Sequence, residues 1–194
     1  MVYSLKICFA TTNKHKLEEA RRILAGYGID LEMVPEKKRE IQSEKLEEIA
    51  EVAALEIAES LGIRVVTEDS GLFIQALNNF PGPYSAYTHD TIGCEGILDL
   101  MRNKTNRRAK FRAVVAYCES TQMPRSFIGI VEGNIAPKAR GIQGFGFDPI
   151  FVPTEGDGRT FAQMTQQEKN QYSHRARAFR NFGEWFQEYQ RSLK

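Results

Sequence analysis

Two adjacent carboxylates follow an apolar run in which a buried strand is expected. Glu68 and Asp69 come directly after the largely β-branched run at residues 63–67, and Ser70 and Gly71 follow them. Acidic residues are poor strand formers, and an unpaired carboxylate is costly to bury, so we expect the pair where the strand ends. The carboxyl end of a buried strand is where α/β sheets bind ligands. These residues therefore predict a ligand site, with solvated loop charges as the alternative.

Magnesium is the ion that this pair would suit. Carboxylate oxygens are hard ligands, and Mg²⁺ usually takes one or two of them together with the phosphate oxygens of a substrate. Glu40 is a further acidic candidate, but it lies in the charged run EKKRE at residues 36–40, where a solvated charge is the stronger interpretation. The metal interpretation is better founded for Asp69, because of its place at the end of the apolar run.

A polar turn near the N-terminus has the composition of a phosphate site. It follows an apolar run at residues 5–10 and precedes a helical pattern at residues 16–24. The N-terminus of a helix presents free N–H groups and partial positive charge, which attract phosphate. The spacing of a Walker A loop is missing, so an ordinary N-capping turn is the alternative. The candidate donors and cations are Thr11, Thr12, Asn13, Lys14 and Lys16.

A glycine-rich segment, GIQGFGFDPIF at residues 141–151, could form a flat slot for a planar ring. Its glycines, Gly146 among them, alternate with Phe145 and Phe147 and are followed by Asp148. The third glycine of the dinucleotide fingerprint G-x-G-x-x-G is absent. A glycine-rich hairpin is the alternative for this segment, and a place in the core is the alternative for each phenylalanine.

A basic cluster opens the last helix of the chain. Ser173 can cap that helix, which places His174 and Arg175 in its first turn, and Lys169 lies just upstream. A cation at a helix N-terminus opposes the helix dipole unless an anion or an acceptor offsets it. A bound ligand would explain this placement, and an exposed basic turn is the alternative.

The elements that must position these residues are those of an α/β protein. The first third reads strand, helix, strand, helix, strand, which favours parallel strands with crossover helices, and a later pair of apolar runs favours an antiparallel pair. We therefore expect an α/β fold with a mixed sheet, in two lobes with a cleft between them. The expected strands are residues 5–10, 31–35, 63–67, 110–118, 125–131 and 150–152, and the expected helices are residues 16–24, 45–61 and 173 onward.

Composition and charge narrow the class of protein. A chain of 194 residues suits one domain, or two lobes that share one core. The formal net charge of +1 argues against a strong field for nucleic acid or membrane. The cysteines are odd in number and lack a C-x-x-C pair, so we expect reduced thiols. Neither a signal peptide nor a run of transmembrane length is found, which predicts a soluble, cytoplasmic protein.

Six segments together resemble one known family, the inosine triphosphate pyrophosphatases, which are house-cleaning enzymes for non-standard purine nucleotides. The segments follow the family's order and approximate spacing from about Phe9 to Arg175. Thr12 stands where the family's first motif usually has glycine, and a positive φ there would strain it. The segments are ATTNKHK, EIQ, EDSGLFIQAL, FPGPYSA, GFGFDPIF and FAQMTQQEKNQYSHR.

The resemblance implies a single domain, residues 1–194, with two lobes, a long central mixed sheet flanked by helices, and a nucleotide cleft between the lobes. It also implies a homodimer. The implied reaction is the Mg²⁺-dependent hydrolysis of non-standard purine nucleoside triphosphates (ITP, dITP and XTP) to the nucleoside monophosphate and pyrophosphate, which removes them from the nucleotide pool.

The resemblance also assigns roles to residues of this chain. Asp69 and Lys16 are the implied catalytic residues, with Asp69 as general base. The implied metal ligands are Glu40 and Asp69; Glu68 is a further ligand, an outer-shell residue, or only a residue that tolerates its position. The implied substrate-binding residues are Thr11, Thr12, Asn13, Lys14, His15, Lys16, Ser70, Phe145, Gly146, Phe147, Asp148, Lys169, His174 and Arg175.

Base selection can be argued from the donors of Arg175. Its guanidinium has donors only, so it can pair with the 6-oxo group of hypoxanthine or xanthine and would face an unmatched donor in ATP. Guanine shares the 6-oxo group, so its rejection would need a backbone N–H facing position 2 of the base.

Three rival functions stay open at this point. A Maf-like nucleotide pyrophosphatase is opposed by the GFGFDP and SHR motifs. A nucleotide-binding sensor without catalysis is opposed by the presence of Glu40, Asp69 and Lys16. An RNA-binding protein would need the basic last helix, whose arginines are more simply explained as solvated.

Overall fold

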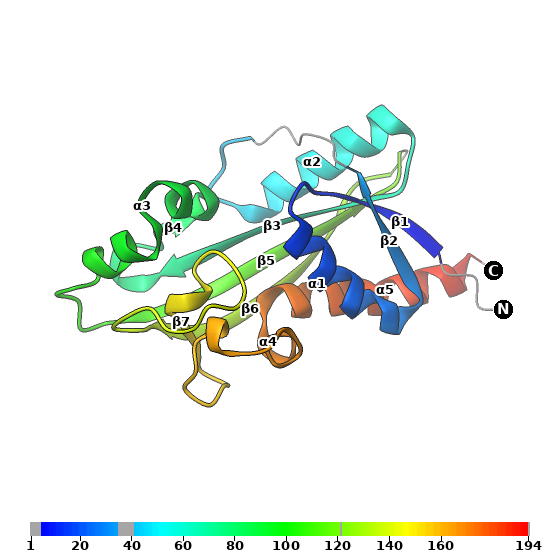
Figure 1. Ribbon diagram of the computed structural model, residues 1–194. Helices are drawn as coiled ribbons and strands as arrows, with labels where there is room; N and C mark the ends of the chain where they lie inside the picture. Colours follow the sequence, from blue (N-terminus) through cyan, green and yellow to red (C-terminus); the bar gives the residue numbers. More distant parts are fainter. Residues whose placement is uncertain (1–4, 35–40, 121, 194) are drawn as a thin grey trace. The chain divides into compact units, whose positions relative to one another are not determined.

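The computed structural model describes residues 5–34, 41–120 and 122–193 of the chain (Figure 1). These residues form two compact units, each assembled from separate stretches of sequence. Unit 1 consists of Met1–Asp69, Ala113–Gly129 and Arg175–Lys194, and unit 2 of Ser70–Arg112 and Ile130–His174. No helix within the described ranges is long and apolar enough to cross a membrane.

A mixed sheet of seven strands forms the framework of the described chain. Its order is β2-β1-β3-β5-β6-β7, and β4 pairs with β3. β1 is parallel to both β2 and β3, whereas the pairs β3–β4 and β6–β7 are antiparallel. The predicted α/β class with a mixed, helix-flanked sheet is confirmed; the cleft between lobes stays a prediction. The strands are β1 (Leu5–Ala10), β2 (Ile29–Val34), β3 (Val65–Ile74), β4 (Pro81–Gly82), β5 (Arg108–Cys118), β6 (Arg125–Ile135) and β7 (Phe151–Pro153).

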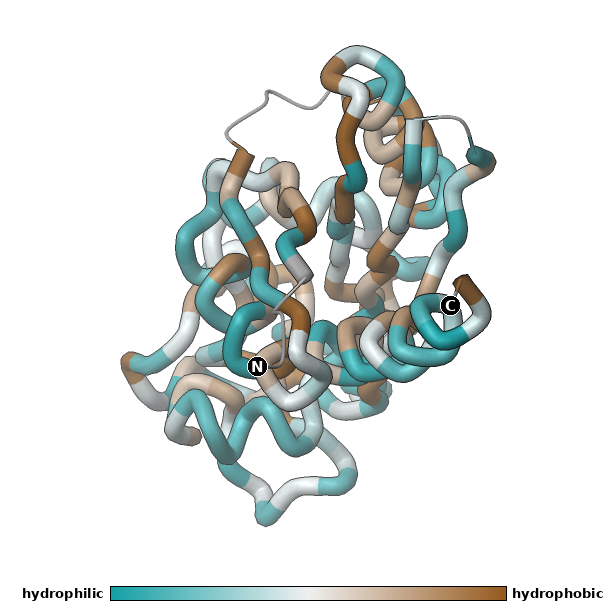
Figure 2. Tube along the Cα trace, turned by 90° about the vertical axis from the view of Figure 1, so that its right-hand side faces the viewer, coloured by the Kyte–Doolittle hydropathy of each residue, from teal (hydrophilic) through white to brown (hydrophobic). Residues whose placement is uncertain are grey.

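Unit 1 is built on the N-terminal strands and three helices. These helices are α1 (Lys14–Leu24), α2 (Leu46–Leu61) and α5 (His174–Ser192, from Arg175 on in this unit). The helices α2 and α5 lie on opposite sides of the strands of this unit (Figure 1). The apolar stripe predicted on the last helix is confirmed. Phe179, Phe182 and Phe186 are buried, and Tyr189 packs against the same core. In Figure 2 hydrophobic and hydrophilic residues alternate along this helix up to the C-terminus, as an amphipathic helix requires.

Unit 2 contains the remaining helices and most of the 3₁₀ turns. They are α3 (Ser85–Leu100), α4 (Gln166–Tyr172) and the 3₁₀ turns η2 (Gln75–Leu77), η3 (Asp148–Ile150) and η4 (Phe161–Gln163), while η1 (Ala25–Tyr27) belongs to unit 1. Phe111, Phe151 and Phe161 lie at the centre of its core, with ring centroids 4.7–6.1 Å apart. Neither α3 nor α4 is predicted from the sequence. Gly93 has a φ of 63° and interrupts α3, which weakens the helical pattern of that segment.

The prediction that the strand ends at the two carboxylates is wrong, because β3 runs on through them to Ile74. Gly71 serves close packing instead of a turn. A Cβ atom on Gly71 would lie 2.8 Å from the carbonyl carbon of Gly82 on β4, so only glycine lets the two backbones approach. The Ser85 hydroxyl completes the contact: it accepts from the Leu72 N–H at 2.8 Å and donates to the Gly82 carbonyl at 2.7 Å.

Candidate functional site

The polar turn before α1 is a helix cap in which the side chains of Asn13 and Thr11 accept from backbone amides. Asn13 Oδ1 accepts from the backbone N–H of His15 at 3.0 Å and of Lys16 at 3.3 Å, and the Asn13 N–H donates to Thr11 Oγ1 at 3.1 Å. The capping alternative is therefore present in the structure, and it leaves Thr12, Lys14 and His15 on the surface. A cap does not conflict with anion binding, because the positive end of the helix remains at this turn.

Thr12 is not strained at the position where the resembled family has glycine. Within the described ranges the only non-glycine residues with a positive φ are Asn78 and Asn79. The turn at residues 11–13 therefore adopts a backbone that any residue tolerates, and the hydroxyl of Thr12 adds a donor that glycine would lack.

Glu68 lies at the centre of a buried ionic network in unit 1. Its Oε2 atom is 2.6 Å from Lys16 Nζ, and its Oε1 atom is 3.0 Å from Arg175 Nη2. Arg175 Nη1 in turn lies 2.6 Å from Oε2 of Glu19. The Glu68, Glu19 and Arg175 side chains are 0%, 3% and 2% exposed, whereas Lys16 retains 20% exposure. Two cations thus balance two anions, which explains how β3 tolerates a buried carboxylate.

Register explains why this network forms beside the polar turn. β1 pairs in parallel with β3 at Cys8 with Val65 and Phe9 with Val66, and β1 ends at Ala10. Glu68 therefore lies just beyond the carboxyl end of β1, next to the turn that leads into α1. The rule that ligands bind beyond strand ends applies here to β1, although β3 itself continues.

Glu19 is a member of the network that sequence reasoning missed. It lies one turn after Lys16 on α1, at the i+3 spacing that places two side chains on one helix face. It is also buried on a helix whose other charges are mostly exposed. The spacing was a usable signal, but its partner Arg175 is 156 residues away and no local pattern indicates it.

Asp69 and Ser70 follow Glu68 on β3, and both are half-buried. The donor chemistry suits Mg²⁺, because Asp69 is a carboxylate that directly follows Glu68, the partner of Lys16, and this ion needs only one or two carboxylates. Among residues 5–34, 41–120 and 122–193 no three His, Cys, Asp or Glu side chains are grouped as a metal cage. The predicted ligand Glu40 lies outside the described residues.

A second group of predicted residues forms around Asp148 in unit 2. Lys169 Nζ lies 2.6 Å from Asp148 Oδ2, and both side chains are buried. The same oxygen accepts the backbone N–H of Phe145 at 2.9 Å, and the Lys169 ammonium lies 5.0 Å from the centre of the Phe145 ring. Three residues singled out in the sequence are thus brought together, with Asp148 as their common partner.

Glycine is required inside this group for two separate reasons. Gly144 has a φ of 74°, and a Cβ atom there would lie 3.0 Å from Cγ of Asp148. Gly146 has a φ of 61°, a conformation that side chains rarely adopt. The glycine-rich segment is therefore shaped by the approach of its own backbone to Asp148.

Phe147 and His174 lie in the interior of unit 2. Phe147 is 3% exposed and belongs to the core cluster of this unit. The His174 ring is buried and stacks on Phe111 with a centroid distance of 4.6 Å. Burial thus favours the core alternative for Phe147, whereas Phe145 is only half-buried.

The predicted residues thus fall into two groups. The polar turn, Lys16, Asp69 and Arg175 belong to unit 1 with Glu68 and Glu19, whereas unit 2 contains Ser70, Phe145, Gly146, Phe147, Asp148, Lys169 and His174.

Known proteins resemble this chain over almost its whole length. The Ham1 family model matches residues 7–185. A dITP/XTP pyrophosphatase of Methanopyrus kandleri is 53% identical, over 94% of this chain and 96% of that protein. A dITP/XTP pyrophosphatase of Hyperthermus butylicus is 46% identical, over 94% and 95% of the two chains. A solved HAM1 protein from Coxiella burnetii superimposes with a TM-score of 0.84, at 31% identity over 95% of this chain and 99% of that one.

Proposed function

This chain belongs to the Ham1 family, and on that premise we propose that it hydrolyses dITP and XTP, and their relative ITP, to the nucleoside monophosphate and pyrophosphate. The family match carries the reaction class, because the relatives at 46–53% identity are dITP/XTP pyrophosphatases. The structural observation that supports it is the Lys16–Glu68 pair at 2.6 Å, beside a helix N-terminus.

The polar turn and Lys16 would hold the triphosphate in this proposal. Lys16 is the partly exposed member of the ionic network, so its ammonium can reach an anion while Glu68 keeps it in place. The N-terminus of α1 adds partial positive charge, and Thr11 and Thr12 add hydroxyl donors. Lys16 would then offset the negative charge that develops on the departing pyrophosphate.

Asp69 is the proposed general base. It would orient the attacking water and take its proton as the water approaches the α-phosphorus. An ordinary aspartate is a weak base at neutral pH, with a pKa near 3.9. Mg²⁺, which Asp69 and Glu40 would hold with Glu68 as a further ligand or an outer-shell residue, would supply charge neutralisation on the phosphates and a more acidic water. Because deprotonation of the attacking water limits such a reaction, the rate of hydrolysis should increase toward alkaline pH.

The Asp148 group of unit 2 is the proposed base-binding part. Phe145 offers a half-buried aromatic ring, and Lys169 and Asp148 offer a donor and an acceptor next to it. Arg175 is proposed to read the 6-oxo group, although its guanidinium already donates to Glu19 and Glu68. Replacement of Arg175 by alanine should therefore lower the ratio of kcat/KM for ITP over ATP. An unchanged ratio would show that Arg175 does not read the base and only stabilises the Glu68 network.

Pyrophosphate release is the test of this function. The purified chain is assayed with dITP, XTP, ITP, GTP, ATP and dTTP, with and without Mg²⁺, and Asp69→Asn serves as the matched inactive variant. We expect release from the first three nucleotides only, and only with the metal. Tight binding of dITP without release would indicate the sensor alternative, and release from modified pyrimidine or methylated nucleotides would indicate a Maf-like activity.

A homodimer in the cytoplasm is the proposed state of the protein. Three aromatic side chains are exposed within one short stretch of unit 2: Phe80 at 40%, Tyr84 at 46% and Tyr87 at 72%. Grouped exposed aromatics are typical of protein interfaces. Sedimentation of the chain and of Tyr87→Glu tests this proposal, with a dimer expected for the first and a weakened dimer for the second.

A further inference from the structure

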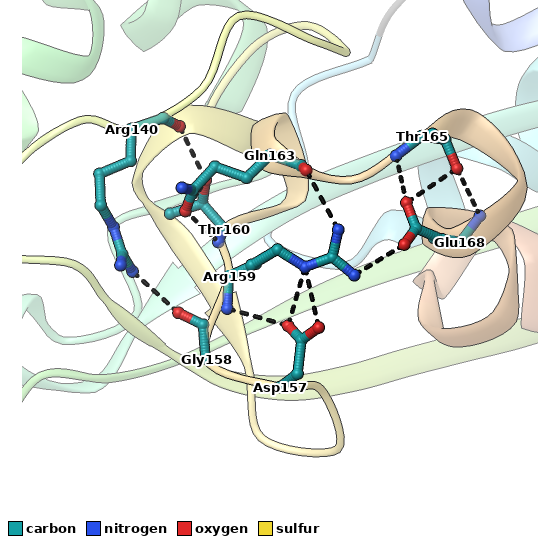
Figure 3. Close-up of polar contacts among 8 residues, drawn as sticks. All are labelled: Arg140, Asp157, Gly158, Arg159, Thr160, Gln163, Thr165 and Glu168. Atoms are coloured by element: carbon teal, nitrogen blue, oxygen red, sulfur yellow. Dashed lines mark hydrogen bonds and ion pairs between the residues drawn. The ribbon is translucent and has the colours of Figure 1, made fainter.

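A polar network in unit 2 joins the loop before α4 to Arg140, which directly precedes the glycine-rich segment at residues 141–151 (Figure 3). None of the residues that form it is among the predicted site residues. We call it the brace and define it as Asp157, Arg159, Thr160, Gln163, Thr165 and Glu168. Its two ends make different contacts, and both lead to the Asp148 group.

Thr160 forms the first end of the brace. It is 0% exposed, and its hydroxyl donates to the backbone carbonyl of Arg140 at 2.7 Å (Figure 3). Its own N–H donates to Gln163 Oε1 at 3.0 Å, which closes the capping box of η4. Thr160 thus fixes the residue that directly precedes the glycine-rich segment.

Two backbone contacts of η4 extend this end of the brace. The Gln143 N–H donates to the Ala162 carbonyl at 2.9 Å. Gly141 has a φ of 82°, and a Cβ atom there would lie 2.6 Å from the backbone nitrogen of Gln163. The glycine-rich segment therefore rests directly on the backbone of η4, and its position depends on where Thr160 holds that turn.

Glu168 forms the second end. Its Oε1 atom accepts from Arg159 Nη2 at 2.7 Å, and its Oε2 atom accepts from Thr165, from the N–H at 2.7 Å and from the hydroxyl at 2.9 Å. Asp157 holds Arg159 through Nε at 2.8 Å. The hydrogen bond from Arg159, followed by those from Thr165, lowers the pKa of Glu168 to about 2, so this carboxylate stays charged at neutral pH.

The second end sets the start of α4, and α4 carries Lys169. The Lys169 N–H donates to the Thr165 carbonyl at 2.9 Å, in the first turn of a helix that has only seven residues. The Lys169 ammonium then reaches Asp148, which holds the Phe145 N–H. One end of the brace thus positions the backbone of the glycine-rich segment, and the other positions the lysine that contacts its aspartate.

We propose that Thr160 and Glu168 are positioning residues for the base of the substrate. They act through the Asp148 group and touch no reacting atom, so their loss should weaken nucleotide binding more than the chemical step. This inference rests on the proposed function, because it takes the Asp148 group to be the base-binding part. Its signature is a raised KM with little change in kcat, the pattern of lost uniform binding.

Thr160→Val is the first test, with Thr160→Ser as its matched partner. Valine keeps the shape and the β-branch but removes the hydroxyl that donates to the Arg140 carbonyl, whereas serine keeps that hydroxyl. We expect KM for dITP to rise on the order of tenfold in the valine variant, the effect of one buried hydrogen bond, and to stay within about twofold of wild type in the serine variant.

Glu168→Gln tests the second end, and Arg102→Met is its control. The glutamine removes the charge that holds Arg159, and we expect a KM rise of about threefold to tenfold. Arg102 forms an exposed pair with Asp99 on the same unit, outside the brace, so its loss should leave KM and kcat unchanged. Thr91→Val removes an exposed hydroxyl that donates to the Tyr87 carbonyl and controls for the loss of a hydroxyl.

Three results would overturn the inference. One is a KM for Thr160→Val and Glu168→Gln equal to that of wild type. Another is an equal rise for Thr160→Val and Thr160→Ser, since the hydroxyl would then be irrelevant. The third is a fall of kcat in proportion to the folded fraction, measured by thermal unfolding, with KM unchanged, which would mark the brace as purely structural.

Direct binding separates this inference from the proposed function. The Kd of the wild type and the variants for a non-hydrolysable α,β-methylene analogue of ITP is measured by calorimetry with Mg²⁺. If wild type binds the analogue but releases no pyrophosphate from dITP, the proposed function fails, and the Kd values still judge the brace. If wild type neither binds the analogue nor releases pyrophosphate from dITP, both the proposed function and the inference on the brace fail.

Discussion

Arg175→Met would break the ionic network of unit 1 at the buried cation that contacts both of its carboxylates. In the folded protein Arg175 pairs with Glu19 at 2.6 Å and with Glu68 at 3.0 Å, and both carboxylates are 3% exposed or less. Methionine fills a similar volume without a charge. The substitution therefore removes the guanidinium that lies 2.6 Å from buried Glu19, while Glu68 keeps Lys16.

The magnitude follows from that arrangement. Removing one partner of a buried ion pair costs about 3–5 kcal/mol of unfolding free energy. Since Lys16 still offsets the charge of Glu68, we expect a loss near the lower limit, about 3 kcal/mol. For a chain of this size that corresponds to a fall in Tm of about 6–12 °C.

The loss of unfolding free energy is measured by urea and thermal unfolding of three variants. Arg22→Met is the control, because Arg22 is an exposed arginine of α1, and it should change the unfolding free energy by less than about 0.5 kcal/mol. Adding Glu19→Gln to Arg175→Met removes the unbalanced charge and should recover roughly half of the loss, since a buried amide costs less than a buried carboxylate. A loss below about 1 kcal/mol in Arg175→Met, or no recovery in the double variant, would refute the network.

Three further outcomes are expected. Asp69→Asn should lower kcat for dITP about 10²–10⁴-fold with an unchanged Tm, as measured by pyrophosphate release and calorimetry, and a fall below tenfold would exclude Asp69 as the base. Gly71→Ala should cost about 1–3 kcal/mol in urea unfolding, because its Cβ meets the Gly82 carbonyl, and wild-type stability would show that the close approach is absent. The pKa of Glu168 is lowered on folding from 4.5 to about 2, so its contribution to stability is present above about pH 4.5 and is lost as the pH falls toward 2. The difference in unfolding free energy between wild type and Glu168→Gln should therefore be constant from pH 5 to 7 and shrink below that range; a constant difference down to pH 2.5 would contradict it.

Periodicity predicts the helices of unit 1 well, because each carries a long apolar stripe. α2 is expected at residues 45–61 and found at Leu46–Leu61, and Gly62 ends it with a φ of 64°. α3 is missed because its polar residues and the break at Gly93 blur the stripe. β3 is predicted too short because Glu68 and Asp69 have poor strand propensity, and the cations that stabilise Glu68 come from distant parts of the chain.

The candidate site likewise has residues that the sequence indicates and contacts that it does not. Composition indicates the polar turn, the carboxylates and the glycine-rich segment, and the family resemblance joins them into one function. The side-chain partners that hold them are not local: Arg175 meets Glu19 across 156 residues, and Lys169 meets Asp148 across 21. Propensity and spacing carry no information on such pairs, so the Arg175–Glu19 pair and the brace emerge only from the structure.

The identity of the products from dITP tests the central claim most directly. Wild-type protein is incubated with dITP and Mg²⁺ in ¹⁸O-labelled water, and the products are analysed by mass spectrometry. Attack at the α-phosphorus predicts one pyrophosphate per dITP, with the label in dIMP and no label in the pyrophosphate. Release of inorganic phosphate with dIDP, or label in the pyrophosphate, would contradict it.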